Sequence, residues 1–306
     1  MQDLSVSLIV PTLNAGKVWL EWIEAVKKQS YPLEKVFVID SGSTDNTVEL
    51  ARESGFIVEV IAKDSFNHGA TRQYAIEKLG NSSIVIFLTQ DAILSSTKSI
   101  ENLIRCFDTK KVSAAFGRQL PRQDANPIEA HARIFNYPPD SRTKIKGDIT
   151  ELGIKTAFIS NSFAAYRCTV LDSVGGFPLH IIMGEDMYVA AKMILNDWSI
   201  IYCASAEVFH SHNYTLFEEF KRYFDTGVLH TREEWLLKEF RKPEKDGLNY
   251  IKSEINYLLK ASPLLVPEAV LRTVFKYVGY NFGKLEKIFP TAMKRVLSMQ
   301  SGYWKQ

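Results

Sequence analysis

Five consecutive large apolar residues, Ile84–Leu88, run directly into Thr89, Gln90 and Asp91. A strand covered on both faces is apolar throughout, so this run predicts a buried strand with a carboxylate just beyond its end. In open α/β sheets, ligands bind beyond the carboxyl ends of the strands, which would place Asp91 at a ligand-binding edge. A carboxylate there suits Mg²⁺ or Mn²⁺, with a bound phosphate completing the coordination. The simpler alternative is that Asp91 caps the following helix, and this segment alone does not decide between them.

Strand-like and helix-like segments alternate through the N-terminal third of the chain. Each helix-like segment has apolar residues at helical spacing and separates two short apolar runs. Single helices between successive strands imply right-handed crossovers, and hence an α/β fold with a doubly wound, mostly parallel sheet and helices on both faces. The expected strands are 6–10, 36–39, 56–61 and 84–88, and the expected helices are 18–28, 46–53 and 71–79.

The pattern becomes looser after Pro121. Residues 123–155 contain several prolines and many charges, which predicts a mobile, partly helical insertion able to close over a bound ligand. We divide the chain into an α/β domain, 1–215, and a helical C-terminal region, 216–306, because the sequence is mainly helical from Leu216 onward. The further elements expected in the first of these are a strand at 158–166, a helix at 186–195 and a strand at 200–208.

The composition limits the class of protein. The net charge is only +2, so the chain as a whole has no bias toward nucleic acid. Cys106, Cys168 and Cys203 are an odd number without CxxC spacing, which favours free thiols in a reducing compartment. The N-terminal Met1-Gln2-Asp3-Leu4 lacks the basic segment of an export signal, and no apolar stretch approaches the ~20 residues of a membrane-spanning helix. We therefore expect a cytoplasmic protein without a nucleic-acid partner.

The turn after the first strand reads Pro-Thr-Leu-Asn-Ala-Gly rather than Gly-x-Gly-x-x-Gly. This difference disfavours a dinucleotide-dependent dehydrogenase. Asp40 ends the second expected strand and would lie beside Pro11 and Thr12 on the same edge of the sheet. Its carboxylate could accept the imide N–H of a uracil or thymine ring. The alternative is a helix cap, a role that Ser43 or Asp45 would fill better.

Arg72 lies in the first turn of an expected helix, within Phe-Asn-His-Gly-Ala-Thr-Arg-Gln. The helix dipole favours an anion at this end, so a cation here is unexpected. A phosphate bound between the helix terminus and the guanidinium would explain it. An ordinary surface arginine is the alternative.

Two further groups carry possible chemistry. Glu185 and Asp186 begin a helix after an apolar approach, a setting that could raise the pKa of a carboxylate and suit it to proton abstraction. Acids at a helix start are also common caps. His210 and His212 flank one serine at the end of an expected strand and could offer either ring to a metal ion, although a structural role is equally compatible.

Four segments in order resemble the family 2 glycosyltransferases with a GT-A fold, over residues 5–215. They are Val-Ser-Leu-Ile-Val-Pro-Thr-Leu-Asn, Val-Ile-Asp-Ser-Gly-Ser-Thr-Asp-Asn-Thr, Thr-Gln-Asp-Ala and Gly-Glu-Asp. Phe-Asn-His-Gly-Ala-Thr-Arg-Gln and Leu-Thr-Gln-Asp-Ala are similar to the bacterial rhamnosyltransferase branch, whose donor is dTDP-L-rhamnose.

The resemblance implies a role for each matching residue. Gln90 stands where many members have an acid, and Ser41 replaces the second acid of the usual Asp-Asp pair. The implied roles are a nucleotide-sugar site at Pro11, Thr12, Asn14, Asp40, Arg72 and Gln90, with Arg72 on the diphosphate; a divalent metal, Mg²⁺ or Mn²⁺, at Asp91 with His210 or His212; and a general base at Asp186 with Glu185 as its neighbour.

The implied reaction is a single displacement that inverts the anomeric configuration. The acceptor would be a glycan or lipid-linked glycan in bacterial surface polysaccharide synthesis of the O-antigen type. A UDP-sugar donor is an alternative within the same class, and a catalytically silent sugar-nucleotide-binding scaffold is an alternative outside it.

The C-terminal tail from Pro263 interleaves large apolar residues with basic ones, including Arg272 and Lys276. A basic amphipathic helix can lie on an anionic membrane surface, which here would be the cytoplasmic face of the inner membrane. Alternatively, the apolar face packs on the α/β domain or on a second copy of the chain, which would make a homo-oligomer.

Overall fold

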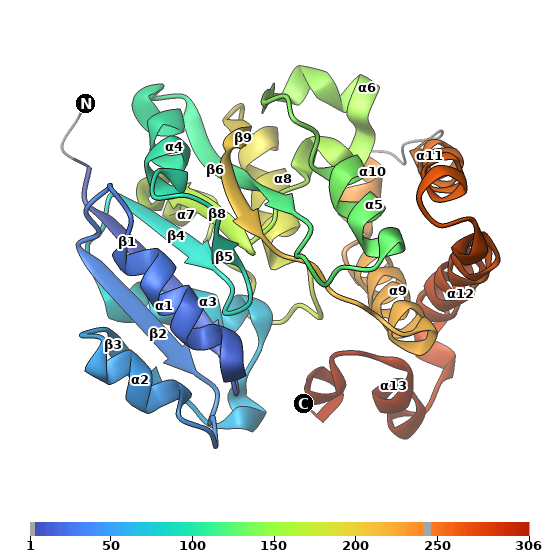
Figure 1. The fold of residues 1–306 in the computed structure, drawn as a ribbon, viewed down its shortest axis with the longest axis horizontal. Coiled ribbons are helices and arrows are strands. Elements are labelled where there is room, and N and C mark those ends of the chain that lie inside the picture. The colour runs from blue at the N-terminus through green and yellow to red at the C-terminus, as the bar shows by residue number, and fades with distance from the viewer. Residues whose placement is uncertain (1–3, 241–245, 306) are drawn as a thin grey trace.

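The computed structural model describes residues 4–240 and 246–305; Met1, Gln2 and Asp3, which contribute to the export-signal argument, lie outside them. Within the described residues one sheet runs through the α/β part of the molecule, with helices on both of its faces (Figure 1). The predicted α/β class with a doubly wound sheet is therefore confirmed. The strands are β1 (Val6–Thr12), β2 (Lys35–Asp40), β3 (Ile57–Val60), β4 (Ile84–Leu88), β5 (Ile93–Leu94), β6 (Val112–Leu120), β7 (Arg142–Lys144), β8 (Phe163–Arg167) and β9 (Ser199–Phe209).

The helices fall into two groups along the chain. The first group covers the sheet, and the second, from Leu216 onward, stands beside it (Figure 1). The helices are α1 (Trp19–Lys27), α2 (Thr47–Glu53), α3 (His68–Leu79), α4 (Ser99–Arg105), α5 (Pro127–Asn136), α6 (Ile149–Leu152), α7 (Cys168–Ser173), α8 (Glu185–Leu195), α9 (Leu216–Arg232), α10 (Glu234–Phe240), α11 (Asp246–Ala261), α12 (Val266–Lys284), α13 (Thr291–Leu297) and the short 3₁₀ helix η8 (Ser301–Lys305).

The sheet order is β3-β2-β1-β4-β8-β6-β9-β5, with β7 paired to β9. The strands from β3 to β4 are parallel, as the sequence predicts, and β6 and β9 are also parallel. β8 lies antiparallel between β4 and β6. The carboxyl ends of β1, β2 and β4 therefore meet at one edge, which becomes the edge of the site.

Side chains of β1 alternate between two apolar layers, as expected for a strand with helices on both faces. Leu8 and Val10 join the layer that contains Trp22 of α1, whereas Ile9 joins the layer that contains Ala75 of α3. Both layers are fully buried at these positions. The site is thus built on a rigid base.

The second half of the sheet differs from the sequence-based expectation. β8 begins at Phe163 rather than near Phe158, because residues Gly153–Ala157 form a 3₁₀ helix and the chain then turns. β6 was not predicted at all, since its buried residues are mostly small. One of them, Gly117, leaves room for Phe163, whose ring would lie 2.3 Å from a Cβ at that position.

The insertion at 123–155 is partly helical, as predicted, but it is tied into the fold. β7 pairs antiparallel with β9, and α5 packs against α11. None of its residues lines the cavity described below. The structure therefore gives no support to a role for this segment in closing over a ligand.

In the C-terminal region α12 packs against α9 through small residues. A Cβ at Gly283 would lie 2.0 Å from the carbonyl oxygen of Phe224, so only glycine permits this approach. Phe282 of α12 still contacts Phe220 of α9, with ring centres 5.9 Å apart. Other large apolar side chains of α12, including Val274 and Tyr277, are exposed. Among the described residues, no helix is both long and apolar enough to cross a bilayer.

Candidate active site

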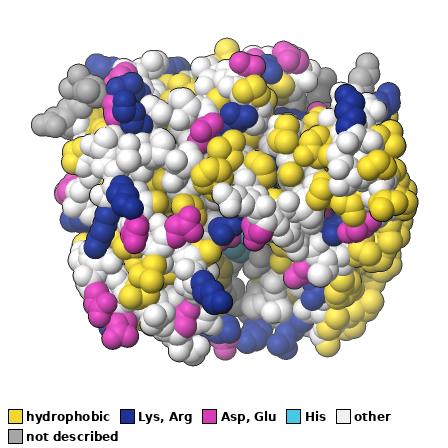
Figure 2. Space-filling model, in the orientation of Figure 1, with side chains coloured by type: hydrophobic (Ala, Val, Ile, Leu, Met, Phe, Trp, Pro, Cys, Tyr) yellow, Lys and Arg dark blue, Asp and Glu magenta, His cyan; other side chains and the backbone are white. Residues whose placement is uncertain are grey.

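A cavity of about 580 Å³ lies at the carboxyl-end edge of the sheet. Figure 2 shows a hollow below the centre of this face, with basic side chains along its lower edge. Of the predicted site residues, seven line the cavity: Pro11, Thr12, Arg72, Gln90, Asp91, His210 and His212. The remaining four, Asn14, Asp40, Glu185 and Asp186, are not part of the lining; Asn14 is exposed, whereas Asp40 and Glu185 are buried. The cavity volume is in the range that accommodates a small-molecule ligand.

Asp40 is fully buried and holds together the two loops that follow β1 and β2. Its Oδ2 accepts hydrogen bonds from the Thr12 and Ser43 hydroxyls, at 2.8 and 2.5 Å. Its Oδ1 accepts the backbone N–H groups of Gly42 and Ser43, at 2.9 and 2.7 Å. The neighbouring Ser41 lines the cavity instead. The structure thus gives Asp40 a clear loop-holding role, and base recognition by this residue stays a prediction.

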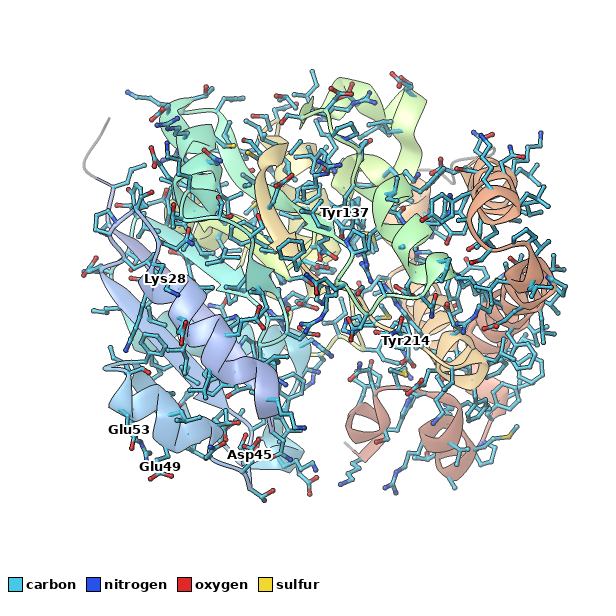
Figure 3. The ribbon with its side chains drawn as sticks, viewed as in Figure 1. Lys28, Asp45, Glu49, Glu53, Tyr137 and Tyr214 are labelled. Carbon is cyan, nitrogen blue, oxygen red and sulfur yellow. The ribbon has the colours of Figure 1, made fainter. Side chains whose placement is uncertain are left out.

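Asn14 joins the same two loops from the outside. Its Oδ1 accepts the backbone N–H of Thr44 at 2.8 Å, and its φ of 47° places it in the left-handed region that asparagine tolerates. Asp45, just before α2 (Figure 3), accepts the N–H of Gly16 at 3.2 Å. These bonds fix the loop after β1 against the loop after β2.

Gln90 holds the loop after β1 from its other side. Its Oε1 accepts the N–H of Leu13 at 2.8 Å, and its Nε2 donates to the Leu13 carbonyl at 3.1 Å. Both ends of the amide are therefore engaged by one backbone unit. A carboxylate could accept the first bond but could not donate the second. The need to hold the loop after β1 through both bonds therefore explains why position 90 is a glutamine.

Asp91, His210 and His212 form a candidate metal centre. Their donor atoms all lie within 4.8 Å of one another. Asp91 Oδ2 is 3.4 Å from His210 Nε2 and 3.6 Å from His212 Nδ1. Burial raises the pKa of Asp91, but the hydrogen bond and charge of His210 outweigh it and hold the pKa below its ordinary value. Burial, followed by the nearby His210, lowers the pKa of His212 to about 4, which keeps its ring neutral and able to bind a metal.

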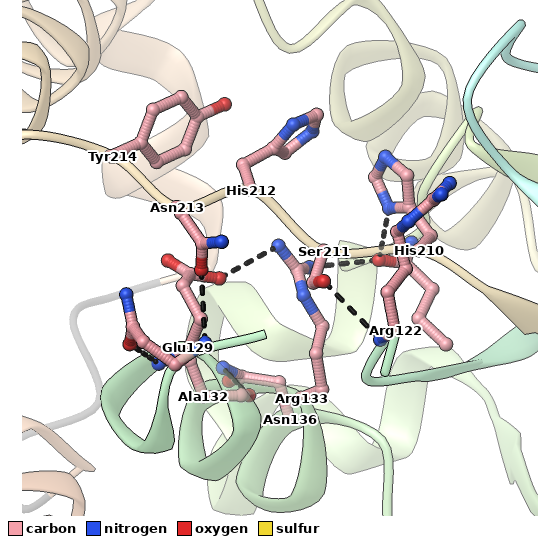
Figure 4. Close-up of polar contacts among 12 residues, drawn as sticks. Arg122, Glu129, Ala132, Arg133, Asn136, His210, Ser211, His212, Asn213 and Tyr214 are labelled. Atoms are coloured by element: carbon pink, nitrogen blue, oxygen red, sulfur yellow. Dashed lines mark hydrogen bonds and ion pairs between the residues drawn. The ribbon is translucent and has the colours of Figure 1, made fainter. Parts of the chain in front are cut away.

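The orientation of His210 supports this assignment (Figure 4). Its Nδ1 lies 2.8 Å from Gln119 Oε1, an amide oxygen that also accepts a hydrogen bond from Arg133 at 2.8 Å. Since an amide oxygen only accepts, Nδ1 must carry the proton, and in a neutral ring Nε2 then presents its lone pair toward Asp91. Without a metal, a proton on Nε2 can bridge the 3.4 Å to Asp91, and a bound cation would take the place of that proton between the two groups. The residues present fit a divalent metal ion.

Arg72 is 5% exposed and lies in the wall of the cavity. Its Nη1 contacts the Glu185 carboxylate at 3.2 Å and donates to the His68 carbonyl at 2.9 Å, and its guanidinium lies 5.7 Å from the Phe87 ring centre. Its Nε is buried without a hydrogen-bond partner among the described residues. The side chain is therefore anchored in the cavity wall through its Nη1, and its contact with a diphosphate stays a prediction.

The two acids of α8 have different environments. Burial raises the pKa of Glu185, but the charge of Arg72 outweighs this effect and lowers it overall. Burial, and then the charge of Glu185, raises the pKa of Asp186 to about 7. The expectation that this setting raises the pKa of a carboxylate is thus confirmed for Asp186. Such a split leaves one stable anion and one group able to accept a proton near neutral pH.

Asn161 connects this acid pair to the cavity. Its backbone N–H donates to Asp186 Oδ2 at 3.1 Å, and its side-chain amide donates to Glu185 Oε1 at 2.9 Å. The next residue, Ser162, lines the cavity. Asp186 therefore lies directly behind the wall at this point.

Several residues of the site were missed in the sequence. His68 lies within Phe-Asn-His-Gly-Ala-Thr-Arg-Gln, the same motif that contains Arg72, so the sequence could have indicated His68 as a site residue. Gln119 and Asn161 carry no motif. The cavity is also lined by Lys63, Asp64, Phe66, Asn67 and, from the far end of the chain, Met299, Gln300, Ser301, Gly302, Tyr303 and Lys305.

The fold and site agree with what sequence comparison finds. A family profile described as "Glycosyl transferase family 2" matches residues 7–175, and the chain belongs to this family of glycosyltransferases. The O-antigen chain rhamnosyltransferase RfbN of Salmonella typhimurium is 48% identical over 303 residues, covering 98% of this chain and 96% of that protein. WbaN of Salmonella anatum, also an O-antigen chain rhamnosyltransferase, is 47% identical over 301 residues, with coverage of 98% and 96%.

Solved structures show the same fold. The mannosyltransferase PcManGT from Pyrobaculum calidifontis, in complex with GDP-Man and Mn²⁺, has a TM-score of 0.64 and 16% identity, covering 94% of this chain and 87% of that chain. S. aureus TarS 1-349 in complex with UDP-GlcNAc has a TM-score of 0.51 and 16% identity, with coverage of 93% and 91%. The expected GT-A type of fold is confirmed.

Proposed function

We propose that this protein transfers L-rhamnose from dTDP-L-rhamnose to a glycan or lipid-linked glycan during O-antigen-type polysaccharide synthesis. The two relatives at nearly half identity, both named O-antigen chain rhamnosyltransferases, support the sugar and the pathway class. The main structural support for catalysis by this protein is the cavity itself. One space is bordered by the β1 loop, Arg72 and the Asp91–His210–His212 cluster, and Asp186 lies directly behind its wall.

The proposed reaction is a single displacement with inversion. Asp186 removes the proton from an acceptor hydroxyl, and the oxygen attacks the anomeric carbon on the face opposite the diphosphate. Arg72 holds the diphosphate by a charge-assisted hydrogen bond. Asp91, His210 and His212 would hold a Mg²⁺ or Mn²⁺ ion, which supplies a Lewis acid for the charge that develops on the leaving diphosphate. Glu185 keeps Arg72 in place.

A binding screen tests the donor and the metal together. Thermal stability is measured with dTDP, UDP and GDP, each with and without Mn²⁺, since a ligand that binds the native state raises the melting temperature. We expect the largest increase with dTDP plus Mn²⁺ and a smaller one with His212→Ala. A larger increase with UDP would indicate a UDP-sugar donor and would contradict the dTDP assignment.

Rhamnose transfer tests catalysis. Asp186→Asn is compared with Asp172→Asn, a matched change at an exposed aspartate of α7. Loss of transfer in the first variant, with dTDP binding retained, supports the assigned base. If the wild-type protein binds dTDP but neither transfers nor hydrolyses the donor, the catalytically silent scaffold is the correct description.

We further propose that the outer face of α12 and the segment after it contact an anionic membrane, where a lipid-linked acceptor would reside. This face is strongly apolar, and Figure 2 shows the apolar surface along the right edge of the molecule. Exposed lysines and arginines, including Lys284, Lys287 and Arg295, lie in the same region. Its exposed apolar side chains are Val270, Leu271, Val274, Tyr277, Val278, Phe282, Leu285, Ile288, Met293 and Val296.

Flotation with liposomes tests this contact. We expect binding to vesicles that contain phosphatidylglycerol, weaker binding to neutral vesicles, and loss of binding in Val274→Asp. Val60→Asp is the matched control, since Val60 is 50% exposed on β3 and Val274 is 49% exposed. Absence of flotation together with a stable dimer in sedimentation would show that a second copy covers this face instead.

A further inference from the structure

The last described residues of the chain return to the cavity. After α13 the chain turns, and residues from Met299 to Lys305 form the wall opposite the carboxyl-end edge of the sheet. Figure 1 shows this segment at the lower centre, below the loops that follow the strands. A segment more than 200 positions away in sequence from Arg72 and Asp91 therefore shares their cavity.

The segment is fixed by contacts with α9. Asp225 of α9 is 1% exposed, and its Oδ2 accepts the backbone N–H of Met299 at 2.9 Å. Trp304 is 7% exposed and packs beside Phe224, with ring centres 6.5 Å apart. Arg232 donates to the Tyr303 hydroxyl at 2.9 Å and lies 5.0 Å from the Trp304 ring centre. Trp304 thus serves as the anchor and leaves its neighbours facing the cavity.

Most of the side chains that this segment presents to the cavity are polar or basic; Met299 is the apolar exception among those that line it. Lys305 Nζ contacts Asp64 Oδ1 at 2.7 Å, and both side chains are substantially exposed, at 42% and 76%. Gln300 interacts with the side chain of His68, whose Nε2 is buried without a hydrogen-bond partner in the described residues. Lys63 lines the same part of the cavity. This wall therefore concentrates donors where an anionic ligand would lie.

We propose that Gln300 and Lys305 are donor-binding residues, and that the segment 299–305 forms the outer wall of the sugar-nucleotide site. Lys305 exchanges its contact with Asp64 for a phosphate oxygen of the bound donor. An exposed ion pair is weak, so this exchange costs little, whereas the diphosphate of the donor carries two negative charges, one on each phosphate. The wall also separates the anomeric carbon from bulk water. This inference rests on the proposed function, because it assumes a nucleoside diphosphate sugar in the cavity.

Binding of dTDP in the presence of Mn²⁺, measured by calorimetry on the full chain, tests the proposal. We expect Lys305→Ala to raise the Kd for dTDP by about three- to tenfold, the loss expected for a partly exposed charge-assisted contact. Lys305→Arg should restore most of the affinity, and Lys252→Ala, an exposed lysine of α11, should have no effect. All of these variants retain Trp304, so the fold of the segment is preserved.

Kinetics and digestion separate this role from a structural one. Gln300→Ala and Lys305→Ala should raise KM for the donor more than they lower kcat, because they remove binding common to substrate and transition state. Bound dTDP should also slow removal of the C-terminal residues by carboxypeptidase. Unchanged Kd and KM in both variants, with digestion insensitive to dTDP, would overturn the proposal. If the wild-type chain binds no nucleotide, the proposed function itself fails.

Discussion

The acid pair at the start of α8 makes a quantitative prediction about pH. A base must be ionised to accept a proton, and burial with the nearby Glu185 raises the pKa of Asp186 to about 7. About half of the enzyme is then in the active form at pH 7 and about a tenth at pH 6, so kcat/KM should fall about fivefold over this interval. An aspartate with the ordinary pKa of 3.8 would be almost fully ionised at both values and would give a flat profile.

The contribution of Asp186 to the pH profile must be distinguished from that of other ionisable residues near the cavity. The pKa of His212 is lowered to about 4 and that of Asp91 is held below its ordinary value, so neither changes its protonation state between pH 6 and pH 8 in the absence of metal. Burial also raises the pKa of Asp225 to about 7, and this residue holds the C-terminal segment. Asp225→Asn therefore serves as a control, and it should keep the pH profile of the wild-type protein.

The assay is transfer of radiolabelled rhamnose from dTDP-L-rhamnose to a lipid-linked acceptor extract, with initial rates between about pH 5.5 and pH 8.5. Asp186→Asn should reduce the rate about 10²- to 10⁴-fold and abolish the acid limb. Glu185→Gln removes a like charge, so it should lower the pKa of Asp186 and move the limb to lower pH. A flat wild-type profile, or full activity in Asp186→Asn, would refute the reasoning.

Two further predictions concern the supports of the site. Arg72→Met leaves the buried Glu185 carboxylate unpaired, and urea unfolding should show a loss of about 3–5 kcal/mol that the added change Glu185→Gln largely reverses; equal stability of the single and double variants would contradict a paired role. Gln119→Leu removes the acceptor that orients His210, and the Kd for Mn²⁺ measured by calorimetry should rise about 10- to 100-fold; an unchanged Kd would show that His210 is not a ligand.

The strands before Asp91 could be predicted because their signals are local. β1, β2 and β4 are apolar runs followed by turn-forming residues, and such runs need no information from elsewhere in the chain. β6 is also largely buried, but four of its nine residues are the small Ser113, Ala114, Ala115 and Gly117. Their small size reflects packing against β8 and β9, so the pattern is meaningful only once the neighbouring strands are placed.

The residues of the site also fall into two groups, those that local sequence indicates and those that depend on the tertiary structure. Asp91 and Arg72 could be found because each follows from the end of a single element. Gln119 meets His210 across 91 positions, and this meeting depends on the register in which Gln119 pairs with Val208. The position of Lys305 in the cavity depends on the whole path of the C-terminal helices. Supporting and covering residues of this kind follow from tertiary structure rather than from a motif.

Gln90 provides a final test, because the sequence and the structure explain it differently. From the family resemblance, glutamine in place of an acid costs the metal site a charge, so Gln90→Glu should improve Mn²⁺ binding. In the structure Gln90 instead holds the backbone of Leu13 through a donor and an acceptor, and the candidate metal ligands are Asp91, His210 and His212. A glutamate would direct a carboxylate oxygen at the Leu13 carbonyl, in place of a hydrogen bond worth about 1 kcal/mol. We therefore expect Gln90→Glu to raise the Kd for dTDP at least fivefold without tighter binding of Mn²⁺ alone, both measured by calorimetry. Tighter Mn²⁺ binding with unchanged dTDP affinity would instead show that position 90 faces the metal.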